Sequence, residues 1–167
     1  MSQSVKERDA TRPAQLALRL FPRLNRWAQA RIERSELGGD LSLRQLSALY
    51  IIRHESATLG EVARRLMVTP AVVTGLIDRL EKRGYVRRVN EPGDRRRIHL
   101  ALTDEGRSRS VDVENSLIAD IADRIAQLSA RDIEALERGL EVLDRVVGEL
   151  EVAHAVRRAT SSLNHTR

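Results

Sequence analysis

The chain has 167 residues, enough for one ordinary domain, and its 2% aromatic content favours a core of packed aliphatic helices over a β-sandwich. Because it has no cysteine, no apolar run of about 18 residues and no apolar N-terminal leader, we expect a cytoplasmic protein without disulfides or membrane spans. The net charge of +5 is divided unevenly, with +5 over residues 58–102 (10 basic, 5 acidic) and −7 over residues 103–151 (6 basic, 13 acidic), which indicates a phosphate-facing lobe rather than a merely solvated surface.

The N-terminal part of the sequence predicts a tail and then a long helix. Residues 1–12 are polar and without a period, so we expect a mobile tail. Pro13 suits the first turn of a helix, and apolar residues then recur at helical spacing until a pair of glycines. We therefore predict an amphipathic helix over residues 13–37, with an apolar face that includes Leu16 and Leu20.

Three shorter helices follow, and each begins at a recognisable capping residue. Ser42 and Gln45 have capping-box spacing, and so do Thr58 and Glu61, so a helix is predicted to start at each pair. Thr69 then caps a fourth helix, which has a proline at its first position and ends at a glycine. The third and fourth helices are close enough in sequence to form a helix-turn-helix.

A β-hairpin and two long helices complete the predicted domain. The strands are expected over residues 85–89 and 98–102, on either side of a polar tip. Thr103 and Ser129 are then the predicted caps of a fifth and a sixth helix, which together cover residues 104–152.

The sixth helix carries apolar residues at alternating steps of three and four, the heptad spacing of paired helices. This face packs either on the fifth helix of the same chain or on a second subunit. Val142 and Val146 supply another apolar face for the intramolecular contact, which favours a dimer. Residues 153–167 lose the period and are expected to be a basic tail. The heptad face consists of Ile133, Leu136, Leu140, Leu143, Val147 and Leu150.

The fourth helix has the kind of surface that can read DNA. Its larger apolar residues are predicted to face the core: Val72, Val73, Leu76, Ile77 and Leu80. The outward stripe is small and polar, so it allows close approach to base edges, and free N–H groups at its start attract phosphate. Thr69 and Thr74 suit hydroxyl contacts with bases, Pro70 and Ala71 suit a thymine methyl, and Arg79 at the flank suits phosphate.

The hairpin tip carries a strong electrostatic signal in four consecutive residues. These are Asp94, Arg95, Arg96 and Arg97. Three neighbouring arginines repel one another unless an anion is near, and the acid beside them can pair with one and aim it. A narrow minor groove attracts inserted arginine, so the tip is interpreted as a DNA contact rather than a solvated turn. Arg87 and Arg88 add phosphate-directed charge along the strand.

Three runs of the sequence resemble the MarR family of bacterial transcription regulators: Val68–Gly84, Glu91–Arg97 and Leu102–Gly106. The resemblance covers roughly residues 13–150. It implies a fold that is mainly α with a small β-hairpin wing, a winged helix-turn-helix with long N- and C-terminal dimerisation helices. It also implies a homodimer that binds double-stranded DNA at a pseudo-palindromic operator.

The same resemblance implies roles for individual residues. The helix over residues 69–83 would enter the major groove, with Arg79 on the DNA backbone. Arg96 would reach the minor groove with Asp94 as its buttress. The family pattern often has alanine where this chain has Arg97, which is therefore either an added phosphate contact or an exposed variant.

Many members of the family respond to small phenolic or anionic compounds bound between the dimerisation helices and the DNA-binding lobe. Oxidant-sensing members use cysteine, which this chain lacks. Trp27 and Arg31 lie one helical turn apart and are similar to a pair in urate-responsive members. The alternative is that Trp27 packs in the dimer core and Arg31 extends to solvent. Tyr50 and His54 either line the same cleft or form a packed core pair.

These observations predict a DNA-binding transcription regulator, a repressor, with a DNA-binding lobe over residues 42–103 in a domain over residues 13–152. The sequence has no nucleophile–base pair, no glycine-rich phosphate loop and no clustered metal ligands, so we predict neither an enzyme nor a bound cofactor or metal. Two alternatives stay open: a nonspecific DNA binder, and a winged helix whose basic tip binds an acidic protein partner.

Overall fold

The computed structural model describes the backbone of residues 2–35, 41–54, 57–91 and 94–164, and the side chains of residues 10–35, 41–54, 57–90 and 98–157. It divides into two compact units, Met1–Ile118 and Ala119–Arg167. Each unit is described by itself.

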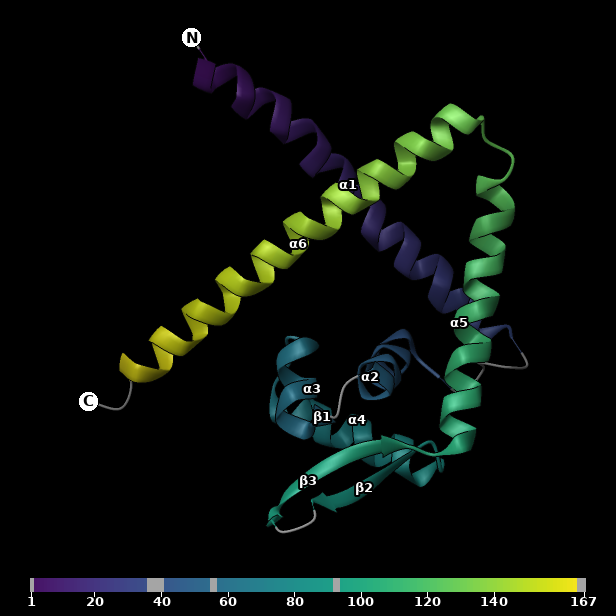
Figure 1. The fold of residues 1–167 in the computed structure, drawn as a ribbon, viewed down its shortest axis with the longest axis vertical. Coiled ribbons are helices and arrows are strands. Elements are labelled where there is room, and N and C mark those ends of the chain that lie inside the picture. Colours follow the sequence, from purple (N-terminus) through teal and green to yellow (C-terminus); the bar gives the residue numbers. More distant parts are fainter. Residues whose placement is uncertain (1, 36–40, 55–56, 92–93, 165–167) are drawn as a thin grey trace. The chain divides into compact units, whose positions relative to one another are not determined.

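The first unit is mainly helical and carries a small antiparallel sheet (Figure 1). The predicted fold class is therefore confirmed. Its elements in chain order are α1 (Ser2–Glu33), α2 (Leu43–His54), β1 (Ala57–Thr58), α3 (Leu59–Arg65), α4 (Pro70–Lys82), β2 (Val86–Glu91), β3 (Asp94–Leu102) and the first part of α5 (Asp104–Ile125).

The predicted capping boxes are present at the starts of α2 and α3. The Thr58 hydroxyl accepts a hydrogen bond from the Glu61 N–H at 3.3 Å, and the Glu61 carboxylate accepts from the Thr58 N–H at 2.6 Å. Because these bonds stabilise the charged form, the backbone hydrogen bond from Thr58 first of all, the pKa of Glu61 lies below its ordinary value. In α2 the Ser42 hydroxyl accepts from the Gln45 N–H at 3.3 Å, and the Gln45 side-chain oxygen accepts from the Ser42 N–H at 2.9 Å.

The core of the first unit lies between α2, α3, α4 and the sheet. Leu49, Val62 and Ile77 are fully buried at its centre, as the amphipathic spacing of the three helices requires. One predicted core residue is placed wrongly by the sequence analysis, because Val72 is 42% exposed. Val72 lies at the edge of the apolar face of α4, where a small rotation of the helix about its axis determines whether a side chain is buried or exposed.

The sheet has three strands in the order β1-β3-β2, so the predicted hairpin is joined by a strand that the sequence analysis missed. β1 has two residues, with Ala57 opposite Leu100 and Thr58 opposite His99. β2 and β3 pair from Val86 with Leu102 to Glu91 with Asp94, and the register is irregular between Asn90 and Glu91. The hairpin therefore extends beyond the predicted strands.

The junction of the wing with α5 explains the Leu-Thr-Asp-Glu-Gly run. The Thr103 hydroxyl donates to the Gly84 carbonyl at 2.5 Å and accepts from the Gly106 N–H at 3.0 Å. A Cβ on Gly106 would lie 2.0 Å from the Tyr85 carbonyl oxygen, so only glycine allows the first turn of α5 to approach this closely. Gly84 has a φ of 76°, in the left-handed region that favours glycine after a helix.

Two predicted helix boundaries are wrong. α1 begins at Ser2 rather than Pro13, so the segment expected to be a tail is helical, and α1 contains both Pro13 and Pro22. The helix ends at Glu33, and the glycine pair expected to end it lies outside the described residues. In the second unit α6 (Ala130–Asn164) continues past residue 152, through most of the segment expected to be a basic tail.

The second unit consists of the end of α5 and α6, which begins at the predicted cap. The Asp132 N–H donates to the Ser129 hydroxyl at 3.2 Å. No α6 side chain that the structure describes is buried, and its apolar residues are exposed or half-buried. Within the described residues no helix is both long and apolar enough to span a membrane.

Candidate nucleic-acid interface

A tight turn sets the start of α4 against the end of α3. Met67 adopts a φ of 52°, in the left-handed region, and the Val68 N–H donates to the Ala63 carbonyl at 3.0 Å. Thr69 then caps α4 in an extended conformation, and Pro70 takes the first helical position, as predicted. This turn fixes the direction of α4, whose first residues lie on the exposed surface.

Two hydroxyl groups on this surface have defined hydrogen-bonding capacity. The Thr69 oxygen accepts from the Val72 N–H at 3.5 Å, so its own hydrogen can be donated outward. The Thr74 hydroxyl donates to the Pro70 carbonyl at 3.0 Å, which leaves its oxygen as an outward acceptor. The helix therefore presents one donor and one acceptor near its N-terminal end.

The outward stripe of α4 is exposed and small. Pro70, Ala71 and Thr74 are exposed, and Gly75, half-buried, has no atom within 4 Å of the position where a Cβ would stand. Arg79 is also exposed, at the flank of the stripe. A surface without bulk at its centre and with a cation at its side can approach a groove of DNA closely.

Arg88 joins the wing to α4 and does not extend freely toward solvent. Its guanidinium forms ion pairs with Asp78 and Glu81, each at 2.6 Å, and the hydrogen bond that it donates to Asp78 raises the pKa of Arg88. The prediction that Arg88 adds phosphate-directed charge is therefore wrong, because its charge is used within the chain. The pairing also offsets part of the negative charge of the two carboxylates, which would repel phosphate.

The remaining wing residues are only partly described. Arg87 is exposed on β2, opposite Ala101 of β3. Four further predicted contacts have a described backbone in β3, but their side chains lie outside the described residues. These are Asp94, Arg95, Arg96 and Arg97.

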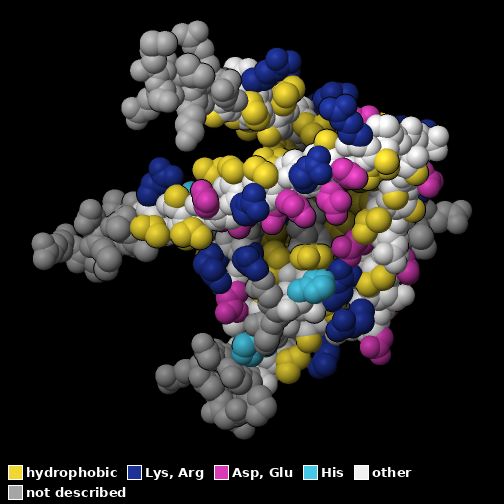
Figure 2. Space-filling view, turned by 45° about the horizontal axis from the view of Figure 1, so that its top comes forward, with side chains coloured by type: hydrophobic (Ala, Val, Ile, Leu, Met, Phe, Trp, Pro, Cys, Tyr) yellow, Lys and Arg dark blue, Asp and Glu magenta, His cyan; other side chains and the backbone are white. Residues whose placement is uncertain are grey.

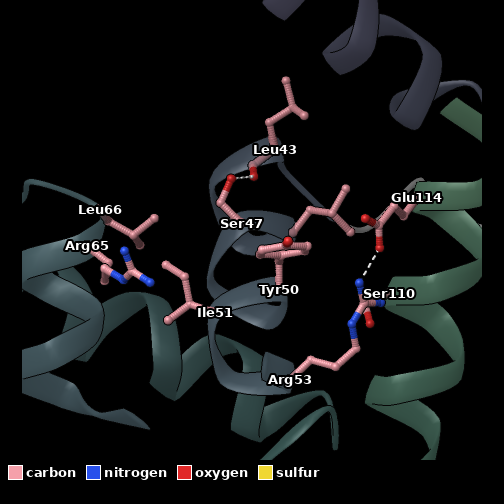
Figure 3. A pocket seen from close by; sticks show the side chains of 10 residues that line it. Leu43, Ser47, Tyr50, Ile51, Arg53, Arg65, Leu66, Ser110 and Glu114 are labelled. Atoms are coloured by element: carbon pink, nitrogen blue, oxygen red, sulfur yellow. Dashed lines mark hydrogen bonds and ion pairs between the residues drawn. The ribbon is translucent and has the colours of Figure 1, made fainter. Parts of the chain in front are cut away.

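A separate cavity of about 400 Å³ lies among α2, the end of α3 and the start of α5 (Figure 3). Tyr50 lines it and is 51% exposed, so it is not a core residue. Arg53 also lines it and forms an ion pair with Glu114 of α5 (Figure 3). The cavity thus has an aromatic wall and a charged pair at its edge.

Of the four residues predicted to bind an effector, Tyr50 lines this cavity and the other three do not. The Tyr50 and His54 rings are in contact, with centroids 4.5 Å apart, but His54 is not among the lining residues. Trp27 and Arg31 do not line it either. Trp27 is exposed on α1, and Arg31 donates to the Ser116 hydroxyl at 3.0 Å.

The predicted dimer residues lie on exposed or half-buried helix faces. Leu16 and Leu20 of α1 are each 50% exposed, and Leu140 of α6 is 51% exposed. Figure 2 shows rows of hydrophobic side chains on the surface of the long helices. The other predicted members of this set, exposed or half-buried, are Leu136, Leu143 and Val147.

The MarR family model matches residues 41–98, which contain α2, α3, α4 and most of the wing. The chain therefore contains a MarR family domain over residues 41–98. A relative in Bacillus subtilis, the HTH-type transcriptional repressor MdtR, is 44% identical over 54 residues. That match covers 32% of this chain and 35% of MdtR, so the chain matches about a third of this relative's length.

Solved structures extend the likeness beyond the DNA-binding lobe. Streptococcus pneumoniae FabT, crystallised in complex with DNA, is 26% identical, and the match has a TM-score of 0.71 over 84% of this chain and 99% of FabT. A MarR family protein from Bacillus stearothermophilus matches with a TM-score of 0.72 and 23% identity, over 85% of this chain and 97% of that protein. The relatives MdtR and PecS, the latter from Dickeya dadantii, are named as transcription regulators rather than enzymes.

Proposed function

We propose that this MarR-family chain is a sequence-specific transcription repressor that binds a pseudo-palindromic operator as a homodimer. The observation that supports this most is the outward surface of α4, where small exposed residues and two hydroxyl groups lie beside a wing held by Arg88. The likeness to FabT, which was crystallised with DNA, and to MdtR, which is named a repressor, supports the same function.

In this proposal α4 enters the major groove with its N-terminal end toward the bases. The Thr69 hydroxyl is then a donor for acceptors such as guanine O6 or N7, and the Thr74 oxygen is an acceptor for an adenine or cytosine amino group. Pro70 and Ala71 provide the apolar contact that suits a thymine methyl. Arg79 binds the DNA backbone beside them.

The wing is proposed to reach the neighbouring minor groove through Arg96, with Asp94 orienting it. Arg95 and Arg97 add cationic charge at the tip, and Arg87 adds it on the strand. The support is the β2–β3 ladder, which extends, across an irregular register between Asn90 and Glu91, as far as the pair Glu91–Asp94 (Figure 1). Residues 95–97 have no partner in the described part of the ladder, but the pairs Asn90–Ile98 and Glu91–Asp94 hold the backbone on both sides of them, which lowers the entropic cost of placing an arginine there.

The homodimer is supported by apolar helix faces that are uncovered in one chain. Leu16, Leu20 and Leu140 are half exposed, and Leu150 is 61% exposed. Exposed apolar faces of this length are typical of protein–protein interfaces. A dimer with two copies of α4 would address two half-sites about one helical turn, roughly 10 base pairs, apart.

A small aromatic or anionic effector is proposed to release the DNA. The support is the cavity lined by Tyr50 and Arg53, whose volume of about 400 Å³ suits a small molecule. Glu114 would compete with an anionic ligand for Arg53, so binding would have to break that pair.

The function is tested by titrating fluorescein-labelled DNA with the protein at about 150 mM salt and following anisotropy. The probes are the intergenic DNA directly upstream of the coding sequence and a scrambled duplex of equal length. We expect preference for the upstream duplex, and a large loss of that affinity in Arg96→Ala without loss of the dimer. Unchanged affinity in Arg96→Ala would overturn the wing contact, and equal binding of the two duplexes by the wild type would favour a nonspecific DNA binder.

A further inference from the structure

A basic groove borders α4 in addition to the surface described above. It has a volume of about 750 Å³ and is lined by the C-terminal half of α1, the start of α2 and one side of α4. Within the described part of the chain, the charged residues among its lining are all arginines: Arg44, Arg79 and Arg83. All three are exposed.

The position of this groove on α4 follows from the spacing of its residues. Val72, Arg79 and Arg83 line it and are separated by seven and four residues, so they share one stripe of the helix. The outward stripe that carries Gly75 is the next one around the helix. Arg88 pairs with Asp78, within that stripe, and with Glu81, on its far side. The groove and the wing therefore lie on opposite sides of the surface proposed to face the bases.

The positive charge of Arg44 does not stabilise the fold. It lies in the first turn of α2, which has no acidic residue, and the positive end of the helix dipole disfavours a positive side chain there. Among the described residues Arg44 has no ion-pair partner. A bound anion between Arg44 and the arginines of α4 would compensate this unfavourable charge.

We propose that Arg44, together with Arg79 and Arg83, binds the phosphate backbone of DNA on the side of α4 opposite the wing. A helix in the major groove lies between two phosphate strands, so a protein that contacts only one of them leaves its tilt undefined. Guanidinium groups match phosphate oxygens in geometry as well as charge. This proposal rests on the proposed function, because it assumes that α4 enters the groove.

The number of phosphate contacts is measured by the salt dependence of DNA binding. Each contact contributes a slope of about −0.9 in a plot of log affinity against log salt concentration, and a homodimer carries two copies of Arg44. We expect Arg44→Gln to reduce the magnitude of the slope by about 1.8 and to weaken binding about 30-fold at about 150 mM salt. The loss should be equal for the upstream and scrambled duplexes, because phosphate contacts carry no sequence information.

Two variants and a melting curve complete the experiment. Arg44→Lys keeps the charge and should keep the slope, whereas Arg107→Gln, an exposed arginine on α5 outside the groove, removes the same charge and should leave the slope unchanged. The thermal midpoint of Arg44→Gln should not fall below that of the wild type, since the side chain is exposed and its charge is unfavourable in the first turn of α2.

Three other outcomes would each contradict the proposed contact of Arg44 with phosphate. An unchanged slope in Arg44→Gln, with wild-type preference for the upstream duplex intact, overturns the groove contact and leaves the proposed function standing. A loss confined to the upstream duplex also overturns it, because Arg44 would then contact a base. A wild type that binds neither duplex overturns both proposals.

Discussion

Gly75 is a residue at which the stability of α4 and its proposed function make opposite demands. It lies inside the helix, where glycine costs about 1 kcal/mol relative to alanine. A Cβ built there meets no atom within 4 Å, so packing within the chain does not require glycine. Gly75→Ala should therefore raise the free energy of unfolding by about 1 kcal/mol, which raises the thermal midpoint by about 2–4 °C in a chain of this size.

The same methyl group would stand in the middle of the stripe that is proposed to approach the bases. We expect Gly75→Ala to weaken binding of the upstream duplex at least about tenfold, equivalent to about 1.4 kcal/mol. Thermal denaturation followed by circular dichroism and anisotropy titration of the same samples measure the two effects. The matched control is Gly148→Ala in α6, which is equally open and should stabilise the helix without changing DNA affinity.

A stabilised Gly75→Ala protein with unchanged DNA affinity would refute the close approach of α4 to DNA. A destabilised protein would instead contradict the reasoning about the helix, because it would mean that a neighbour occupies the space beside Gly75.

Three further changes have defined outcomes. Gly106→Ala should lower the free energy of unfolding by about 1–3 kcal/mol or more, as measured by urea denaturation, because its Cβ would lie 2.0 Å from the Tyr85 carbonyl oxygen; a neutral result would contradict the tight junction. Glu61→Gln should lose less stability than the wild type as the pH falls below 4.5, the ordinary glutamate pKa. Because folding lowers the pKa of Glu61, its stabilisation is present above that pH and is lost as the pH falls. Acid denaturation curves of the two proteins that superimpose would argue against the Thr58 capping box. Leu140→Asp should convert the dimer to monomers in analytical ultracentrifugation while the circular dichroism of the first unit persists, and an intact dimer would exclude Leu140 from the interface.

Local capping signals made much of this fold predictable. Thr58, Thr69 and Ser129 each accept a hydrogen bond from the backbone N–H three residues further along the chain, so a few adjacent residues determine where the helix begins. The exposed stripe of α4 followed in the same way from helical spacing, except at Val72. That residue lies at the boundary between two faces, where the neighbouring elements decide its burial.

The features that the sequence analysis missed depend on residues far apart in the chain. β1 has only two residues and exists because β3 offers an open edge beside it, which no periodicity within the strand can indicate. Arg88 pairs with Asp78, which lies 10 positions away in the sequence. Arg44 lines the same groove as the arginines of α4 only once the chain has folded. The helical segment before Pro13 contradicts the usual position of proline in the first turn, and nothing in the structure explains it.

The central claim is that this chain reads a DNA sequence with α4 and its wing. The most direct test is repeated selection of the purified protein on a pool of random-sequence duplexes, because the operator sequence then emerges from the selection itself. We predict enrichment of an inverted repeat whose half-sites lie about 10 base pairs apart. A selected pool with no more sequence preference than the starting pool would contradict the claim and favour a module that binds DNA without specificity or binds a protein instead.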